Sequence, residues 1–337
     1  MVCCFSSTEI PLVSRDATLW PFSSTSAFNT PIGSDAVFVD HPLLRSVTWV
    51  FNGPGPMWSV PVALYDPASP LVNITQSNQC NEGSGFTPLS LRIQSGVTGA
   101  DPQTCYRDGM LCVLSDDGYA YGFAQFRRTS DTTGLAAYHQ RYSFDHLITG
   151  TGYNPAAGVW TGKGHWTAGT SVIAGLIRKW EVEAIAADSL PYMRHAIGIG
   201  LPDSILRNDG GGGQAATYRW PATFSDGGYA AYSGTVWMGS LLAIPPTFNI
   251  EAQPWNAPAK VLARTLQKFG GYNVVRAGTA NIMVEIGALQ GPITQMNQYL
   301  YAIRNELRLV DNNTPTTVGG GGNYPSELWP VPPPTLP

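Results

Sequence analysis

The stretch at residues 169–202 reads GTSVIAGLIRKWEVEAIAADSLPYMRHAIGIGLP, and here a helix-like pattern interrupts a sequence of strands and turns. Pro191 ends the expected helix, and residues 193–201 are expected to form a strand that Pro202 closes. Charged residues lie mostly on one helix face, which we expect to be solvated: Arg178, Lys179, Glu181 and Glu183. The apolar or small residues share the other face: Ile177, Trp180, Val182, Ala184, Ile185 and Ala187.

His195 lies on this strand, and a rigid element of that kind can hold a working side chain still. Near neutral pH a histidine acts as a general base or acid. In a polysaccharide lyase, His or Tyr removes the proton α to a uronate carboxyl while Arg neutralises that carboxylate. The residues with this chemistry are His195, Arg194, Arg178 and Tyr218. The alternative is that His195 is a hydrogen-bonded residue that packs under the helix.

The composition combines few charges with many turn-forming and aromatic residues. Charged residues make up 12% of the chain, where about 25% is usual for a soluble domain. The chain has 37 glycines and 27 prolines, and 11% of its residues are aromatic. These features are typical of strands joined by long loops. We therefore expect a mainly β protein, a β-sandwich or jelly roll with two or three short helices inserted.

Local signals place several elements. A β-hairpin is expected at residues 110–126, because Asp117-Gly118 joins two strand-like runs. Further helices are expected at residues 257–269, where an apolar stripe recurs at helical spacing, and at 294–306.

The chain is expected to form one domain between two terminal segments. Residues 1–16 are interpreted as an N-terminal arm and residues 17–310 as a single β-sandwich domain with long loops. Residues 311–337 are interpreted as a Gly/Pro-rich C-terminal tail of linker-like character.

Charge and hydropathy exclude some classes of partner. The net charge is −4 and no Lys/Arg cluster occurs. The chain therefore lacks the concentrated positive charge that is typical of nucleic-acid-binding proteins. No run of apolar residues reaches the length of a membrane span. The first residues, MVCCFSSTEIPLVSRD, lack the basic and apolar regions of a signal peptide. We expect an extracellular or virion-surface location, reached by cell lysis or through an export signal outside this sequence.

No pattern indicates a cofactor or a metal. The cysteines lack zinc-site spacing, although Cys80 can pair with Cys105 or Cys112 if the environment is oxidising. The loop at residues 206–214 is either a site for a calcium-like cation or a flexible connector, and it lacks the alternating ligands of a calcium loop.

Carboxylates give only a weak hydrolase signal, because glycosidases need a well-placed pair. Asp116, Asp117 and Asp226 are interpreted as turn formers. Asp145 lies on an expected strand and is a better candidate.

Several short signatures recur in an order that resembles a known group of proteins. They are WPF…FNTPI at 20–32, G-x-x-x-x-AGLIR at 169–178, RHA-x-x-x-x-LP at 194–202, RWPA at 219–222, MG-x-x-L at 238–242 and K-x-G-G at 268–271. Together they resemble an uncharacterised group of secreted bacterial proteins often found with carbohydrate-active modules. The resemblance covers residues 17–285 and implies a β-rich extracellular protein associated with polysaccharide, without an established activity.

One departure from that group concerns residues 274–278. The group tends to show an Asp-Asn-Gly turn after the late helix, where this chain has VVRAG. If that acid is catalytic in the group, this chain has lost it. The lack of an export signal also favours a phage-borne or otherwise lysis-released copy.

Aromatic residues are the better clue to a ligand, because exposed Trp and Tyr stack on the apolar faces of sugar rings. The loop candidates for carbohydrate binding are Trp160, Trp166, Tyr153 and Tyr138, whereas Trp58, Trp220 and Trp237 are interpreted as strand residues of the core. Three hypotheses remain open: a polysaccharide lyase or glycoside hydrolase, a carbohydrate- or receptor-binding module without catalysis, and a structural virion or surface protein that assembles with copies of itself or with virion neighbours.

Overall fold

The structure is a computed structural model, mainly β with three α-helices in the described part of the chain and no barrel. It describes residues 14–52, 59–77, 86–100, 109–156, 158, 165–208, 213–226, 228–328, 332 and 334–336. The coarse expectation of a mainly β fold with a few inserted helices is confirmed.

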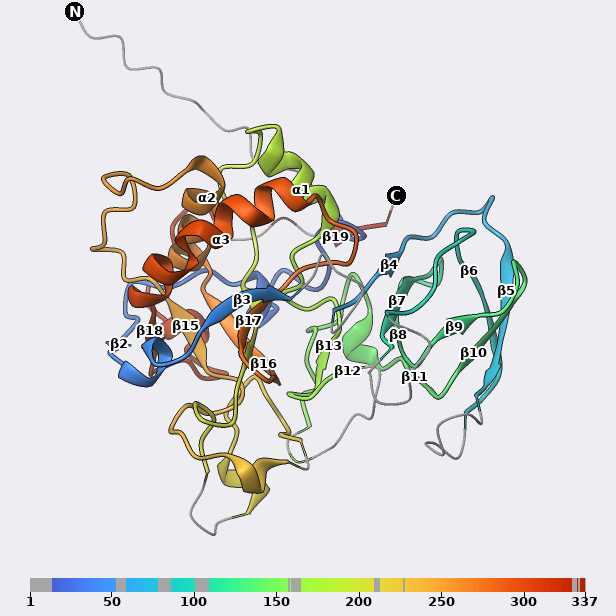
Figure 1. The fold of residues 1–337 in the computed structure, drawn as a ribbon, viewed down its shortest axis with the longest axis horizontal. Helices are drawn as coiled ribbons and strands as arrows, with labels where there is room; N and C mark the ends of the chain where they lie inside the picture. The colour runs from blue at the N-terminus through green and yellow to red at the C-terminus, as the bar shows by residue number, and fades with distance from the viewer. Residues whose placement is uncertain are drawn as a thin grey trace, which may run out of the picture.

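A seven-stranded mixed sheet organises most of the chain (Figure 1). Its interior strand β14 is buried along its whole length, as expected of an apolar run covered on both faces. Strand β14 pairs parallel with β16 and antiparallel with β17, so β14 and β16 end at the same edge of the sheet. The strands in order are β2 (Phe38–Val39), β18 (Arg308–Val310), β15 (Leu241–Ala243), β16 (Gly271–Arg276), β14 (Ile197–Leu201), β17 (Ala280–Met283) and β3 (Trp49–Asn52).

Three helices gather on one side of this sheet, and the long segment between β14 and β15 extends away from them (Figure 1). They are α1 (Lys179–Ala186), α2 (Ala257–Lys268) and α3 (Gln290–Asn305). All three were expected, and α3 begins four residues earlier than residue 294. Within the described residues, no helix has the length and apolar character needed to cross a membrane.

Two four-stranded sheets form the other end of the molecule and share a separate hydrophobic cluster, which includes Val72 and Ile74 from one sheet and Val113 and Phe123 from the other. The expected hairpin is confirmed, because β7 and β8 pair antiparallel around Asp117-Gly118. One sheet has the order β6 (Leu89–Arg92), β5 (Leu71–Gln76), β10 (Thr133–Ala136) and β9 (Arg127–Arg128). The other has the order β11 (Tyr138–Gln140), β8 (Ala120–Ala124), β7 (Leu111–Leu114) and β4 (Val62–Ala63).

Two small strand pairs complete the sheets. Strand β1 (Arg15–Asp16) pairs with β19 (Pro334–Thr335), so the C-terminal segment is held against the start of the described chain. Strands β12 (His165–Trp166) and β13 (Thr170–Ser171) form a hairpin. The short 3₁₀ helices are η1 (Ala27–Asn29), η2 (Pro42–Arg45), η3 (Ser143–Asp145), η4 (Gln214–Ala216), η5 (Tyr229–Ala231) and η6 (Val318–Gly320).

The stretch at residues 169–202 packs more tightly than its pattern indicates. Gly175 has a φ of +74°, and a Cβ there would lie 2.5 Å from the backbone nitrogen of Gly198 in β14. Glycine is therefore required for the AGLIR segment to lie against β14. The backbone confirms this contact, because Gly198 N donates to Gly175 O.

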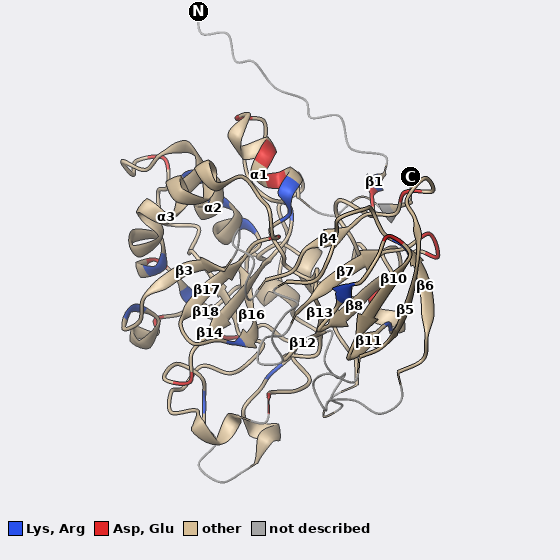
Figure 2. Cartoon of the chain, turned by 45° about the vertical axis from the view of Figure 1, so that its right-hand side comes forward, with Lys and Arg blue, Asp and Glu red and all other residues tan. Residues whose placement is uncertain are grey.

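The expectation that Glu181 faces solvent is wrong. Its side chain is buried, because it caps the start of α1 by accepting a hydrogen bond from Arg178 N at 2.9 Å. Arg178 is buried as well and pairs with Glu285. Figure 2 shows the acidic and basic residues that α1 and the chain just before it contribute.

Candidate functional site

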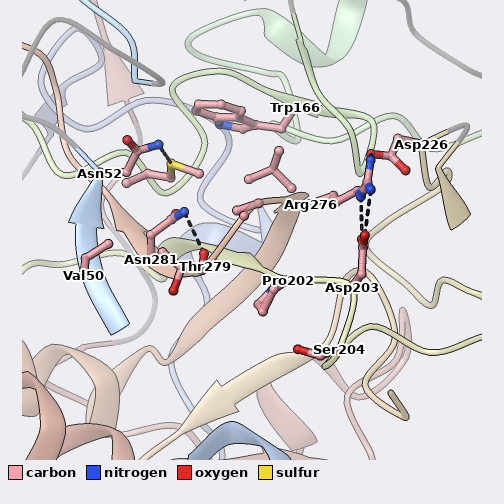
Figure 3. Close-up of a pocket in the computed structure, with 14 residues that line it drawn as sticks. Val50, Asn52, Trp166, Pro202, Asp203, Ser204, Asp226, Arg276, Thr279 and Asn281 are labelled. Atoms are coloured by element: carbon pink, nitrogen blue, oxygen red, sulfur yellow. Dashed lines mark hydrogen bonds and ion pairs between the residues drawn. The ribbon is translucent and has the colours of Figure 1, made fainter. Parts of the chain in front are cut away.

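A cavity of about 970 Å³ opens where β14 and β16 end (Figure 3). Asp203 follows β14, Arg276 ends β16, Asn281 lies on β17 and Trp166 lies on β12. In open sheets, ligands bind in the crevice outside the carboxyl ends of parallel strands. The volume is in the range of small-ligand sites, which is about 300–1,000 Å³.

A β-bulge in β16 shapes this edge of the sheet. Asn273 lies opposite Ile199 and Val275 opposite Gly200, so Val274 is the extra residue. Bulges re-aim side chains and are frequent beside functional sites. Here both Val275 and Arg276 line the cavity.

The bulge also anchors the hairpin that carries Trp166. The carbonyl of Val274 accepts a hydrogen bond from Ala168 N at 2.9 Å, so the turn between β12 and β13 is fixed on the sheet. With its amide oriented to donate, Asn273 Nδ2 lies 3.2 Å from both Ile199 O and Val275 O. The irregular backbone is therefore satisfied by hydrogen bonds on both strands.

Three charged residues form one side of the cavity (Figure 3). Arg276 donates from Nε and Nη2 to the two carboxylate oxygens of Asp203, at 2.5 and 2.7 Å. Its Nη1 lies 3.7 Å from Asp226 Oδ2. The hydrogen bonds from Arg276 hold the pKa of Asp203 below its usual value, and the same pairing raises the pKa of Arg276.

Asp226 is held by groups of its own loop. Its Oδ1 accepts hydrogen bonds from Gly228 N and from the hydroxyl of Tyr232, both at 3.0 Å. Burial and the neighbouring Asp226 carboxylate raise the pKa of Tyr232, so this hydroxyl stays a donor. The turn-forming role expected for Asp226 is present, and the same carboxylate also faces Arg276.

The remaining lining is aromatic and polar. Trp166 is only 5% exposed, and its indole N–H has no hydrogen-bond partner in the described residues. Asn281 is 6% exposed and donates to Thr279 O at 3.2 Å. Its Oδ1 lies over Gly200, where a Cβ would come within 2.6 Å of that oxygen. The cavity thus offers an aromatic ring, carboxylates and an amide around one volume.

The residues proposed for lyase chemistry lie away from this cavity. His195 Nε2 lies 3.0 Å from Glu181 Oε1, and Arg178 Nε lies 2.8 Å from Glu285 Oε2. The structure therefore brings His195 and Arg178 into one buried network. The cavity beside them has a volume of about 10 Å³, which is about the space of one water molecule.

Arg194 and Tyr218 are placed elsewhere. The Arg194 guanidinium lies over the ring of Tyr192, 5.9 Å from its centroid. Tyr218 pairs with Met238 in the segment between β14 and β15. The catalytic roles proposed for these residues stay predictions.

Two of the four aromatic candidates flank β13. Tyr153 and Trp166 both pair with Thr170, one on each side. Of these, Trp166 lines the large cavity, whereas Tyr153 packs edge-on against Trp220 with centroids 5.6 Å apart. Tyr138 is half-buried on β11. Trp160 lies outside the described residues.

The other chemical candidates give no second site. Asp145 is buried and pairs with His165 at 2.9 Å. Cys112 carries a free, buried thiol, and Cys80 and Cys105 lie outside the described residues. Within the described part of the chain, no group of three or more His, Cys, Asp or Glu side chains is placed to hold a metal ion.

Sequence reasoning missed Asp203 and Arg276. The one local signal for Asp203 was its position directly after a strand closed by Pro202. Comparisons with protein-family models, with curated proteins and with solved structures gave no match. The resemblance to secreted bacterial proteins therefore stays a prediction, and the function has to be argued from the cavity.

Proposed function

We propose that this protein binds carbohydrate, and that the sugar occupies the cavity at the ends of β14 and β16. The observation that carries the proposal is the placement of Trp166 and the Asp203–Arg276–Asp226 group around one cavity. A pyranose ring has an apolar face that packs on an indole, and hydroxyls that need planar polar partners. The cavity supplies the polar partners and the exposed part of the Trp166 indole.

The polar groups are held in place before a ligand arrives. Arg276 fixes Asp203, while Tyr232 and Gly228 fix Asp226. A site that is already ordered loses less conformational entropy on binding, so more of the contact energy appears as affinity. Carboxylates accept hydrogen bonds from sugar hydroxyls at the same time as they accept from Arg276, because each has several lone pairs.

Binding without catalysis is favoured over hydrolysis at this site. A general acid must be protonated near the working pH. The pKa of Asp203 is lowered, and Arg276 donates two hydrogen bonds to its carboxylate. Both features favour the ionised form, which cannot act as a general acid. The lyase alternative at His195 would need more space than the one-water cavity beside it.

The finer expectations about architecture and location belong to the same proposal. The hydrophobic cluster shared by the two four-stranded sheets supports a β-sandwich over residues 60–140, a smaller part of the chain than the expected 17–310. An extracellular or virion-surface role in contact with polysaccharide agrees with the low charge and with the resemblance quoted above.

The proposal is tested by isothermal titration calorimetry with neutral and acidic oligosaccharides on the wild type and on Trp166→Ala. Trp255→Ala is the matched control, because Trp255 packs against Phe248 outside the cavity lining. We expect at least one oligosaccharide to bind, about tenfold more weakly to Trp166→Ala, and equally well to the control. Binding that survives Trp166→Ala unchanged would contradict the proposal, as would chain cleavage with a rate that depends on Asp203.

A further inference from the structure

Arg207, Trp237 and Arg219 form a row on the segment between β14 and β15. Arg207 N donates to Val236 O at 2.8 Å, and Arg219 N donates to Met238 O at 2.9 Å. The two arginines therefore reach the strand-like segment 236–238 on either side of Trp237. Val236 and Met238 are fully buried, whereas the side chain between them is half-buried and faces outward.

Both guanidinium groups lie against the same indole. Their central carbons are 4.4 Å (Arg207) and 5.4 Å (Arg219) from the Trp237 centroid. Such cation–π contacts fix an arginine on an aromatic face and leave its terminal N–H groups able to bind an anion. The row is therefore a preformed arrangement of two cations and one ring.

The arginines have more donors than the protein satisfies. Within the described chain, Arg207 has no side-chain hydrogen bond or ion pair, and its buried Nε has no acceptor. Arg219 donates to Asp311 and to Val310 O, both at 3.3 Å, and its Nε also lacks an acceptor. Asp311 is 58% exposed, so it offsets one charge of the pair only in part.

This row lies close to the carbohydrate cavity. Arg207 is four positions after Asp203, and an extended chain of that length spans at most about 14 Å. The real separation is shorter, because the chain turns here: Ile205 N and Leu206 N both donate hydrogen bonds to Pro202 O. A single oligosaccharide is long enough to contact both places.

We propose that the Arg207–Trp237–Arg219 row is a subsite for an acidic sugar of the same carbohydrate ligand, whose carboxylate the two arginines bind while Trp237 holds their guanidinium groups in place. This inference rests on the proposed function. The cavity itself suits neutral sugar units, because its Arg276 already binds Asp203 through two hydrogen bonds. Together the two subsites select a polysaccharide that contains uronate units.

The test compares the trimer of galacturonic acid with the neutral trimer of galactose by calorimetry at low and high salt. The variants are Arg207→Gln and Arg219→Gln, with Arg264→Gln as the control, because Arg264 binds Glu251 on the helix surface. We expect the acidic trimer to bind more tightly than the neutral one, with an affinity that falls as salt rises. Arg207→Gln should weaken it about tenfold, and Arg264→Gln should leave it unchanged.

Several results would overturn the inference. If both trimers bind equally, or if Arg207→Gln behaves like Arg264→Gln, the acidic subsite is rejected while carbohydrate binding in the cavity stands. If neither trimer nor any other oligosaccharide binds, the proposed function fails together with the subsite. Tighter binding of a single-stranded oligonucleotide than of either trimer would assign the row to phosphate instead of uronate.

Discussion

His195 and Glu181 form a largely buried hydrogen bond of 3.0 Å between the first turn of α1 and the chain two residues before β14. The other ring nitrogen of His195 lies 3.0 Å from Ala196 O. Both partners are acceptors, so this arrangement favours the charged imidazole, which carries a proton on each ring nitrogen. This arrangement makes His195 a structural cation that joins α1 to the central sheet.

Replacing this cation should change the pH dependence of stability. Burial lowers the pKa of His195, whereas the charge and the hydrogen bond of Glu181 raise it. The effect of Glu181 is the larger, so the pKa of His195 lies above 6.5. The stabilisation is therefore complete below pH 6.5 and is lost as pH rises through the raised pKa. Urea denaturation should show His195→Gln less stable than wild type by about 1.5–3 kcal/mol at pH 6, with a smaller difference at higher pH.

His139 provides a control of opposite sign. Burial lowers its pKa, the nearby Arg141 lowers it further, and the hydrogen bond with Thr87 O only partly opposes them. The wild type should therefore lose stability relative to His139→Gln as pH falls below 6.5. Equal pH profiles for the two variants would contradict both assignments.

The ion pair between Arg178 and Glu285 should be costly to break from one side. Their side chains are 5% and 4% exposed, so removing Arg178 leaves a buried carboxylate whose remaining cation is the more exposed Lys179, 3.8 Å away. Arg178→Met should lower the free energy of unfolding by about 3–5 kcal/mol. The double variant Arg178→Met/Glu285→Gln should recover part of this loss, and a single variant as stable as wild type would show that the pair is not needed.

Gly175 tests the contact between the AGLIR segment and β14. Gly175 has a left-handed backbone conformation, which strains any other residue, and an added Cβ would also clash with the backbone of Ile197 and Gly198. The clash cannot be relieved without moving β14. Gly175→Ala should destabilise the protein by at least about 1–3 kcal/mol. The control Gly291→Ala lies in α3 with open space around it and should be neutral or slightly stabilising. Thermal melts of the two variants give the comparison.

Asp203 tests the polar side of the cavity. Asp203→Asn removes a charge from Arg276 and one strong acceptor from the ligand. We expect at least about tenfold weaker oligosaccharide binding, measured by calorimetry, with Asp188→Asn on the exposed turn after α1 as the control. Unchanged affinity in Asp203→Asn would remove this carboxylate from the site.

The sequence was sufficient to predict the helix and the strand around residues 169–202, because helical spacing and two prolines are local signals. The strand was expected from residue 193 but begins at Ile197, so His195 lies before β14 and not on it. The sequence was insufficient to predict the burial of Glu181. Helical spacing shows which residues share a face of α1. It does not show that His195, fourteen residues after Glu181, packs against the polar face. The pattern of charges alone is typical of a solvated helix surface.

The cavity could not be predicted for a related reason. Asp203 and Arg276 are 73 residues apart and meet only because β14 and β16 pair in parallel. Parallel pairing needs a long crossover connection and leaves no turn signal in the sequence. The bulge at Val274, which brings Arg276 to the cavity and fixes the Trp166 hairpin, has no sequence signal that we recognise.

The most direct measurement follows the indole N–H resonance of Trp166 by two-dimensional NMR during titration with the oligosaccharide that binds best. The chain has ten tryptophans, so the resonance is assigned by its loss in Trp166→Phe. If the cavity binds carbohydrate, the Trp166 signal shifts along a saturating curve that gives the same Kd as calorimetry. The signal of Trp255 stays in place. A bound oligosaccharide that leaves the Trp166 signal unmoved would contradict the proposed site.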